Sequence, residues 1–181
     1  AAAASDGRLW ELWFTSVPQP EQTAAYISSA LAGQAEGHML PGAVRELGTN
    51  TIVGTTRYHD MVPDIDRVEI GYTWYAAGWQ RTHVNTACKL LLLSHAFDTL
   101  QCQVVGFRTD QYIFISQRAI GALGAKKDGI LRHERLLSFS DTGDTVIYTI
   151  LANEWPHVRR HLEFRMSRTP VELPASPVVS N

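Results

Sequence analysis

In some segments of the chain every second residue is apolar, and in others apolar residues recur every three or four positions. This pattern predicts strands that alternate with helices. The clearest pattern lies in residues 68–100. Aromatic and β-branched residues from Ile70 to Tyr75 predict a strand, which Ala76-Ala77-Gly78 ends. Further along, spacings of three and four predict the buried face of a long amphipathic helix: Leu90, Leu93, Ala96, Phe97 and Leu100, widened by Leu91 and Leu92 until little of the helix is exposed. We expect the other elements to be arranged around this strand and helix.

Similar patterns predict the remaining elements. Helices are expected over residues 1–14, 20–36, 116–123 and 153–161, and strands over 39–47, 51–60, 103–108, 126–137 and 145–151. The first two strands form a hairpin around Gly48-Thr49-Asn50 and the last two form another, with a loop over 61–64. The helix over 20–36 is expected to bury Ala24, Ile27, Ala30 and Leu31. We expect one domain over 1–166 and a flexible, proline-containing tail over 167–181.

Composition limits the classes of protein to which the chain can belong. Its 181 residues, of which 45% are hydrophobic, suffice for one sizeable core. A net charge of -2 and a pI near 6.4 give no general attraction to nucleic acid or to an anionic membrane. Cys88 and Cys102 are too few for a disulfide framework, and no apolar run reaches the ~18 residues of a membrane span. We therefore expect a soluble cytoplasmic protein, whose Ala-rich start without Met indicates a missing preceding segment.

A polar segment over 80–86 joins the predicted strand to the predicted helix. It ends where the helix must expose its first unpaired backbone N–H groups, and such a turn can bind an anion. The alternative is an ordinary helix start in which Asn85 or Thr86 is the N-cap.

Three segments together resemble the GNAT N-acetyltransferases, in particular the RimJ/RimL-like branch, which acetylates amino groups from acetyl-coenzyme A (acetyl-CoA). They are VEIGYTWYAAGWQRTHVNTACKLLLLSHAFDTL, VVGFRTDQYIFISQRAIGALGAKKDGILR and DTVIYTILANEWPHVRRHL. The resemblance implies an α/β (α+β) fold with a GNAT-like mixed, mostly antiparallel central sheet flanked by helices. The strand that normally precedes the first helix is absent, so one sheet edge is expected to be open or covered by a partner, which would permit a homodimer.

The resemblance also implies where acetyl-CoA binds. The family pattern Gln/Arg-x-x-Gly-x-Gly/Ala matches at Gln80, whereas His83 and Asn85 stand where small residues belong. Because backbone N–H groups make the phosphate contacts, the segment is still expected to bind through Gln80, Arg81, Thr82, His83, Val84, Asn85 and Thr86. The thioester carbonyl is expected to bind a backbone N–H within Ile70, Gly71, Tyr72 and Thr73, where two parallel strands diverge.

Acetyl transfer to an amine needs a base for the ammonium proton. Glu69 is the candidate, because strand alternation places it on the face opposite Val68 and Ile70. The alternative is a solvated glutamate, or one that is paired with Arg57 or Arg67.

The reaction also needs an acid for the leaving thiolate, and Ser116 is the candidate. The family segment reads roughly Thr-Asp-x-x-Asn-x-x-Ser, with which Thr109, Asp110 and Ser116 are in register. Ile113 replaces the Asn and cannot form the hydrogen bond expected there. The alternative is that Ser116 is only a helix N-cap.

Aromatic residues could line a pocket for the acceptor, or could belong to the core. The candidates are Trp10, Trp13, Tyr58 and Trp74, with Tyr72 and Tyr75 beside them. The seven histidines are scattered, and only His157 and His161 have the spacing of a ligand pair, so no metal site is expected.

The predicted function is N-acetyl transfer from acetyl-CoA to a primary amine by direct attack in a ternary complex. The acceptor could be a protein N-terminus, such as that of a ribosomal protein, or a small amine. One alternative is a non-catalytic acyl-CoA-binding or regulatory module with a degenerate site, which Ile113 and the absent first strand favour. Another is an interaction protein that binds no ligand.

Overall fold

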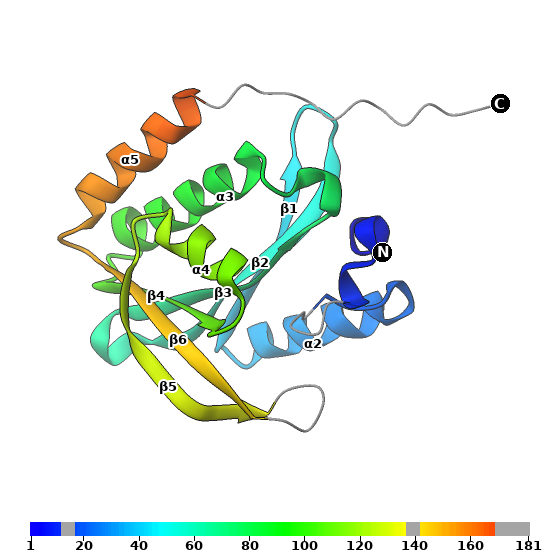
Figure 1. The fold of residues 1–181 in the computed structure, drawn as a ribbon, viewed down its shortest axis with the longest axis horizontal. Coiled ribbons are helices and arrows are strands. Elements are labelled where there is room, and N and C mark those ends of the chain that lie inside the picture. The colour runs from blue at the N-terminus through cyan, green and yellow to red at the C-terminus, as the bar shows by residue number, and fades with distance from the viewer. Residues whose placement is uncertain (12–16, 137–141, 169–181) are drawn as a thin grey trace.

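A computed structural model describes residues 1–11, 17–136 and 142–168 (Figure 1). Its centre is one sheet with the strand order β1-β2-β3-β4-β6-β5. The strands are β1 (Met39–Glu46), β2 (Thr51–Val62), β3 (Arg67–Tyr75), β4 (Val104–Asp110), β5 (Lys126–Leu136) and β6 (Thr142–Leu151). Neighbouring strands are antiparallel except β3 and β4, which are parallel. The expected α/β fold, with a mixed and mostly antiparallel sheet between helices, is confirmed.

Both predicted hairpins are present. β1 pairs with β2, and β5 pairs with β6 at the other edge of the sheet. β2 continues to Val62 and is followed by a 3-10 turn at Pro63–Ile65, so the loop expected over 61–64 begins later than predicted. Residue 137, the expected end of one strand, lies outside the described residues.

The N-terminal segment is not the single helix expected over 1–14. It forms a short helix, α1 (Ala2–Ser5), and a 3-10 segment (Asp6–Glu11). Gly7 and Arg8 interrupt the helix because their φ angles, 76° and 49°, lie in the left-handed region. Residues 12–14 lie outside the described residues.

Three helices cover one face of the sheet (Figure 1). They are α3 (His83–Ser94), which continues as a π-helical turn (His95–Thr99), α4 (Phe114–Gly121) and α5 (Trp155–Arg168). Their apolar residues form the main core with alternate residues of the strands, among them Val68 and Ile70 of β3. The other helix, α2 (Thr23–Ala35), lies on the opposite face, where Tyr26 contacts Arg57.

The buried face predicted for the central helix is correct in its middle and wrong at its margins. Leu93, Ala96 and Phe97 are buried in the main core, as expected. Leu91, however, is 73% exposed, and Leu100 is half exposed. The helix packs on the sheet with one face only, so its outer leucines reach the solvent.

Three of the four residues that were predicted to be buried on α2 are exposed. Ala24, Ile27 and Leu31 are exposed, and the buried residues are Ala30 and Gly33. A Cβ atom on Gly33 would lie 3.3 Å from the Cβ of the first residue of β1. Helix α2 therefore packs on β1 through its small residues, and its larger apolar residues face outward.

The last helix is longer than the expected 153–161. It runs from Trp155 to Arg168, with Pro156 in its first turn, and includes two residues that were expected in the tail. In the described parts of the chain, no helix combines the length and the apolar character that crossing a bilayer requires.

Candidate functional site

The parallel strands β3 and β4 separate after three paired residues. Their pairing runs from Arg67 with Val104 to Glu69 with Gly106 and ends there. From Ile70 to Tyr75, β3 pairs only with β2 on its other side. The backbone N–H groups of β3 that face β4 are therefore available to a ligand, because a sheet edge without a partner strand leaves its polar groups unpaired. Sequence reasoning could name this segment but not demonstrate the divergence.

A β-bulge lies where the two strands separate. Thr55 of β2 pairs with Trp74, but Arg57 pairs with Gly71, so two residues of β3 oppose one residue of β2. The first of these two, Tyr72, has a φ angle of 50°. The bulge reverses the alternation of side chains in the second half of the strand.

A buried lysine contacts both sides of this bulge. The Nζ of Lys89 on α3 donates to Oγ1 of Thr73 at 2.7 Å and to Oγ1 of Thr56 at 3.2 Å. Lys89 is 5% exposed, and burial lowers its pKa to about 8. This contact between α3 and the bulge was not foreseen, because a lysine in an amphipathic helix is expected to face the solvent.

The N-cap of α3 is Thr82, so the alternative that Asn85 or Thr86 caps the helix is wrong. Thr82 Oγ1 accepts a hydrogen bond from the N–H of Val84 at 3.3 Å and donates one to the carbonyl of Trp79 at 2.7 Å. The helix therefore begins three residues earlier than an Asn85 cap would allow.

The candidate phosphate-binding residues of this turn differ in accessibility. Arg81 is exposed, and His83 and Asn85 are half-buried. Val84 and Thr86 are buried, so they can offer only backbone groups to a ligand. The exposed Gln80 donates through Nε2 to the carbonyl of Tyr75 at 3.0 Å, which ties the turn to the end of β3.

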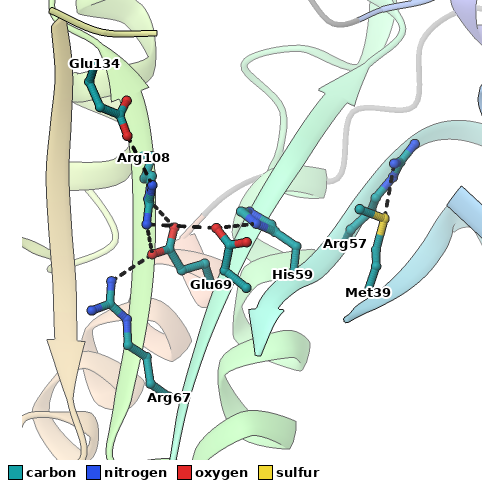
Figure 2. A network of polar contacts seen from close by, with 8 residues as sticks. Met39, Arg57, His59, Arg67, Glu69, Arg108 and Glu134 are labelled. Atoms are coloured by element: carbon teal, nitrogen blue, oxygen red, sulfur yellow. Dashed lines mark hydrogen bonds and ion pairs between the residues drawn. The ribbon is translucent and has the colours of Figure 1, made fainter. Parts of the chain in front are cut away.

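Glu69 lies on the face of the sheet opposite the main core, as predicted, but it is not solvated. It is 1% exposed and is held by two arginines (Figure 2). The Nη2 of Arg67 lies at 2.7 Å, and Arg108 contributes Nε at 2.8 Å and Nη2 at 3.0 Å. The hydrogen bonding to Glu69 raises the pKa of Arg108. The expected pairing with Arg67 is present, that with Arg57 is not, and the partner Arg108 was missed.

Beside Glu69 lies a histidine that sequence reasoning passed over. The Nδ1 of His59 on β2 is 3.2 Å from Oδ2 of Asp60, and the imidazole edge meets the ring of Tyr72 with centroids 5.2 Å apart. The ring covers the backbone at Gly71, where a Cβ would lie 2.3 Å from Nε2. Burial lowers the pKa of His59, so the imidazole is neutral at pH 7. The predicted hairpin would have placed His59 near the central strand, which is the signal that could have found it.

Three ligand atoms in this region lie close enough to hold a metal ion. His59, Asp60 and Glu69 each bring one such atom within 4.8 Å of the other two, and no other group of this kind occurs in the described ranges. The carboxylate of Glu69, however, already has two guanidinium partners. Its charge is thus compensated by protein groups, and the donor set is a poor fit for a metal ion.

Ser116 lies in the first turn of α4 and is half-buried. The N-cap of that helix is Ile113, which provides no side-chain cap, so the alternative that Ser116 is the N-cap is wrong. The neighbouring Asp110 is 1% exposed, accepts from the N–H of Tyr112 at 2.8 Å and pairs with Arg135 at 2.9 Å. The segment after β4 is therefore anchored through Asp110.

Two of the four aromatic candidates for an acceptor pocket, Tyr58 and Trp74, lie on opposite faces of the sheet. Tyr58 is 4% exposed, donates to the carbonyl of Leu92 at 2.5 Å and belongs to the main core on the α3 side. Trp74 lies on the α2 side, where its Nε1 is 3.3 Å from the hydroxyl of Tyr26. Trp10 is half-buried in the N-terminal segment, and Trp13 lies outside the described residues. Tyr58 is thus a core residue, because its position in β2 points it away from α2.

Comparison with known proteins gave one family and many solved structures. A family model described as an acetyltransferase (GNAT) domain matches residues 1–126. A Thermus thermophilus protein assigned as an acetyltransferase is 31% identical, with 90% of this chain and 84% of that chain covered and a TM-score of 0.76. Two further structures share the fold at 20% identity: a GCN5-related N-acetyltransferase from Brucella melitensis (96% and 78% covered, TM-score 0.81) and Mycobacterium smegmatis RimJ in complex with CoA-disulfide (80% and 68%, 0.69). The search of curated proteins gave no match.

Proposed function

The chain belongs to the GNAT acetyltransferase family, and from this premise we propose that it transfers the acetyl group of acetyl-CoA to a primary amine by direct attack in a ternary complex. The observation that supports this most is the separation of β3 from β4 beside the first turn of α3. In the proposal, unpaired N–H groups within 70–73 bind the thioester carbonyl. Backbone N–H groups at the start of α3, together with Arg81, bind the pyrophosphate.

Two side chains are candidates for the base, and His59 is better placed than Glu69. Oε1 of Glu69 accepts hydrogen bonds from Arg67 and Arg108, Oε2 is ion-paired with Nε of Arg108 without a hydrogen bond among the described residues, and the carboxylate is almost fully buried. His59 is neutral at pH 7, and its Nδ1 contact with Asp60 leaves Nε2 as the proton acceptor next to β3. Glu69 then acts as a positioning residue, since it holds Arg108, which lies 3.9 Å from Asp60.

The proposed reaction proceeds without a covalent enzyme intermediate. His59 takes the proton of the ammonium, the amine nitrogen bonds to the acetyl carbon, and the carbon–sulfur bond breaks. The thiolate then takes a proton, for which the hydroxyl of Ser116 in the first turn of α4 is the candidate donor. The second proton that the nitrogen loses as it becomes an amide restores the Ser116 hydroxyl through solvent, so the protons balance. Both cysteines of the chain are buried, which supports direct attack.

The acceptor is a protein N-terminus, as for the RimJ/RimL-like branch, or a small amine. Isothermal titration with acetyl-CoA, followed by a thiol-release assay over peptides and small amines, tests the proposal. We expect saturable binding and release of free thiol that depends on the amine. Binding without release on any acceptor would instead support the non-catalytic acyl-CoA-binding module, and no binding would contradict both.

A further inference from the structure

Arg57 is a buried cation with no acidic partner among the residues that the structure describes. It lies on β2, is 4% exposed and is the one arginine in the buried set of the described residues. Its guanidinium carbon lies 4.4 Å from the ring centroid of Tyr26 on α2 and 4.6 Å from that of Tyr72 on β3. Its Nη1 donates a hydrogen bond to the sulfur of Met39 at 3.3 Å (Figure 2). A thioether is a weak acceptor.

Two of the donor atoms of Arg57 have no partner among the described residues. Nε and Nη2 are inaccessible to solvent and form no hydrogen bond there. Burial of a cation without an acidic partner carries a large desolvation cost, which the two ring contacts offset only in part. The other arginines of this face differ, because Arg67 and Arg108 both contact Glu69.

The unpaired atoms form the edge of a guanidinium that suits an oxyanion. Nε and Nη2 are adjacent donors, and such a pair binds the two oxygens of a carboxylate or phosphate in parallel. Tyr26 is half-buried, and its hydroxyl contacts the indole nitrogen of Trp74. The ring of Tyr26 covers one face of the guanidinium, and the helix that carries it packs on β1 through small residues. Binding of a ligand at the buried edge requires this ring to move.

The position of this edge relates it to the reaction proposed above. Tyr72 lies at the bulge where β3 leaves β4. Arg57 lies over the face of its ring, and His59 makes a T-shaped contact with the same ring. Arg57 and His59 are two residues apart on β2 and both contact this ring, so an amine held at His59 would have Arg57 nearby on the same face of the sheet. We propose that Nε and Nη2 of Arg57 bind a carboxylate or phosphate group carried by the amine acceptor, within a few bonds of its amino group. This inference rests on the proposed acetyl transfer and adds the class of acceptor.

Matched pairs of amines test the inference. Glycine and β-alanine are compared with their amides, and phosphoethanolamine with ethanolamine, by thiol release at saturating acetyl-CoA. For the wild type we expect kcat/KM for the acid to exceed that for its neutral partner at least ~10-fold, the factor that about 1.4 kcal/mol provides. In Arg57→Met the ratio falls to near one, because the bidentate contact is lost. The carboxylate and phosphate pairs show separately which oxyanion is preferred.

The matched control is Arg45→Met. Arg45 is exposed on the neighbouring strand β1 and donates to the side chain of Asn50, so its removal should leave the acid-to-neutral ratio unchanged. A wild-type ratio near one, or the same high ratio in Arg57→Met, would overturn the inference. If Arg57→Met does not fold, Tyr26→Ala decides instead, since it opens the edge and should lower KM for the acids but not for the neutral amines.

Different results would contradict the proposed acetyl transfer and the inferred class of acceptor. If neutral and acidic amines are acetylated equally, the acetyl transfer stands and the acceptor class is wrong. If no amine is acetylated, inorganic phosphate and glycine can be tested as ligands by thermal shift. Stabilisation of the wild type and of Arg45→Met, but not of Arg57→Met, would then support an anion site while the proposed reaction fails.

Discussion

Glu69 is a buried carboxylate whose place in the sheet depends on two arginines. Removal of an ion from water costs several kcal/mol unless partners replace its hydration. Arg67 on the same strand and Arg108 on β4 do so (Figure 2), and both of these side chains are partly exposed. The residue is therefore suited to hold other groups in place, and less suited to exchange protons with a substrate.

Glu69→Gln should lower kcat with little change in the Kd of acetyl-CoA. The neutral amide leaves Arg67 and Arg108 without a counter-charge, so we also expect the free energy of unfolding to fall by about 1–3 kcal/mol. Kinetics, titration and urea denaturation measure the three quantities. The control is Glu163→Gln, which removes an exposed pair with Arg159 and should change none of them appreciably. An unchanged kcat would remove Glu69 from the mechanism.

His59→Gln should lower kcat/KM by about 10²–10⁴, the usual contribution of a positioned base. Burial lowers the pKa of His59 from its ordinary 6.5, so the neutral, active form persists below that pH. The wild-type rate should therefore fall on acidification only below pH 6.5, and this acid limb should vanish in the variant. His38→Gln, at an exposed histidine near the start of β1, is the control. An acid limb that survives in His59→Gln would assign the proton to another group.

At the scale of elements, the bulge in β3 depends on a contact with α3. Lys89 reaches from the helix to hydroxyls on both strands that flank the bulge. The contact fixes the first half of α3 over the point where β3 leaves β4. Lys89 and Gln80 thus both tie the start of α3 to β3, and the proposed cofactor site requires these two elements together.

Lys89→Met should change how stability depends on pH. The pKa of Lys89 is about 8 in the folded protein against an ordinary 10.5, so between these values the unfolded chain holds a proton that the folded chain has released. The stability contributed by this side chain therefore rises with pH through that window, by up to about 1.4 kcal/mol per pH unit. Urea unfolding of both proteins at about pH 7, 8 and 9 measures this as a growing advantage of the wild type. Parallel pH dependences would show that Lys89 is not buried as described.

At the scale of the molecule, the sheet separates two environments. The face under α3, α4 and α5 holds the main apolar core. The opposite face carries Arg57, His59 and Glu69 beneath and beside α2. In the proposed function, the diverging part of β3 meets the cofactor from one side of the sheet and the acceptor from the other.

Acetyl-CoA should stabilise the whole domain, because it is expected to contact β3 and the start of α3 together. At a free concentration about 100 times its Kd, a ligand that binds only the folded state adds about 2.7 kcal/mol. Thermal unfolding with and without acetyl-CoA measures the resulting rise in Tm, and adenosine at the same concentration is the control. No shift at saturating acetyl-CoA would contradict the proposed binding site.

The sequence by itself determined most elements and the fold class. Both hairpins, the strand at 68–75 and the long helix follow from residue spacing and turn residues, which act locally. The prediction of a single helix over 1–14 and the prediction of the buried residues of α2 were wrong for the same reason. Left-handed angles at Gly7 and Arg8, and the packing of Gly33 on β1, depend on neighbours that local spacing does not encode.

Only the tertiary structure decided the candidate site. Strand alternation placed Glu69 on the correct face, but its partner Arg108 comes from a strand 39 residues later. Arg57 and His59 gained their surroundings from the register of β2 on the bulged β3, and that register is set by pairing between strands. Burial, charge pairing and the divergence of β3 from β4 arise when distant segments meet, so residue spacing could suggest the chemistry but could not locate it.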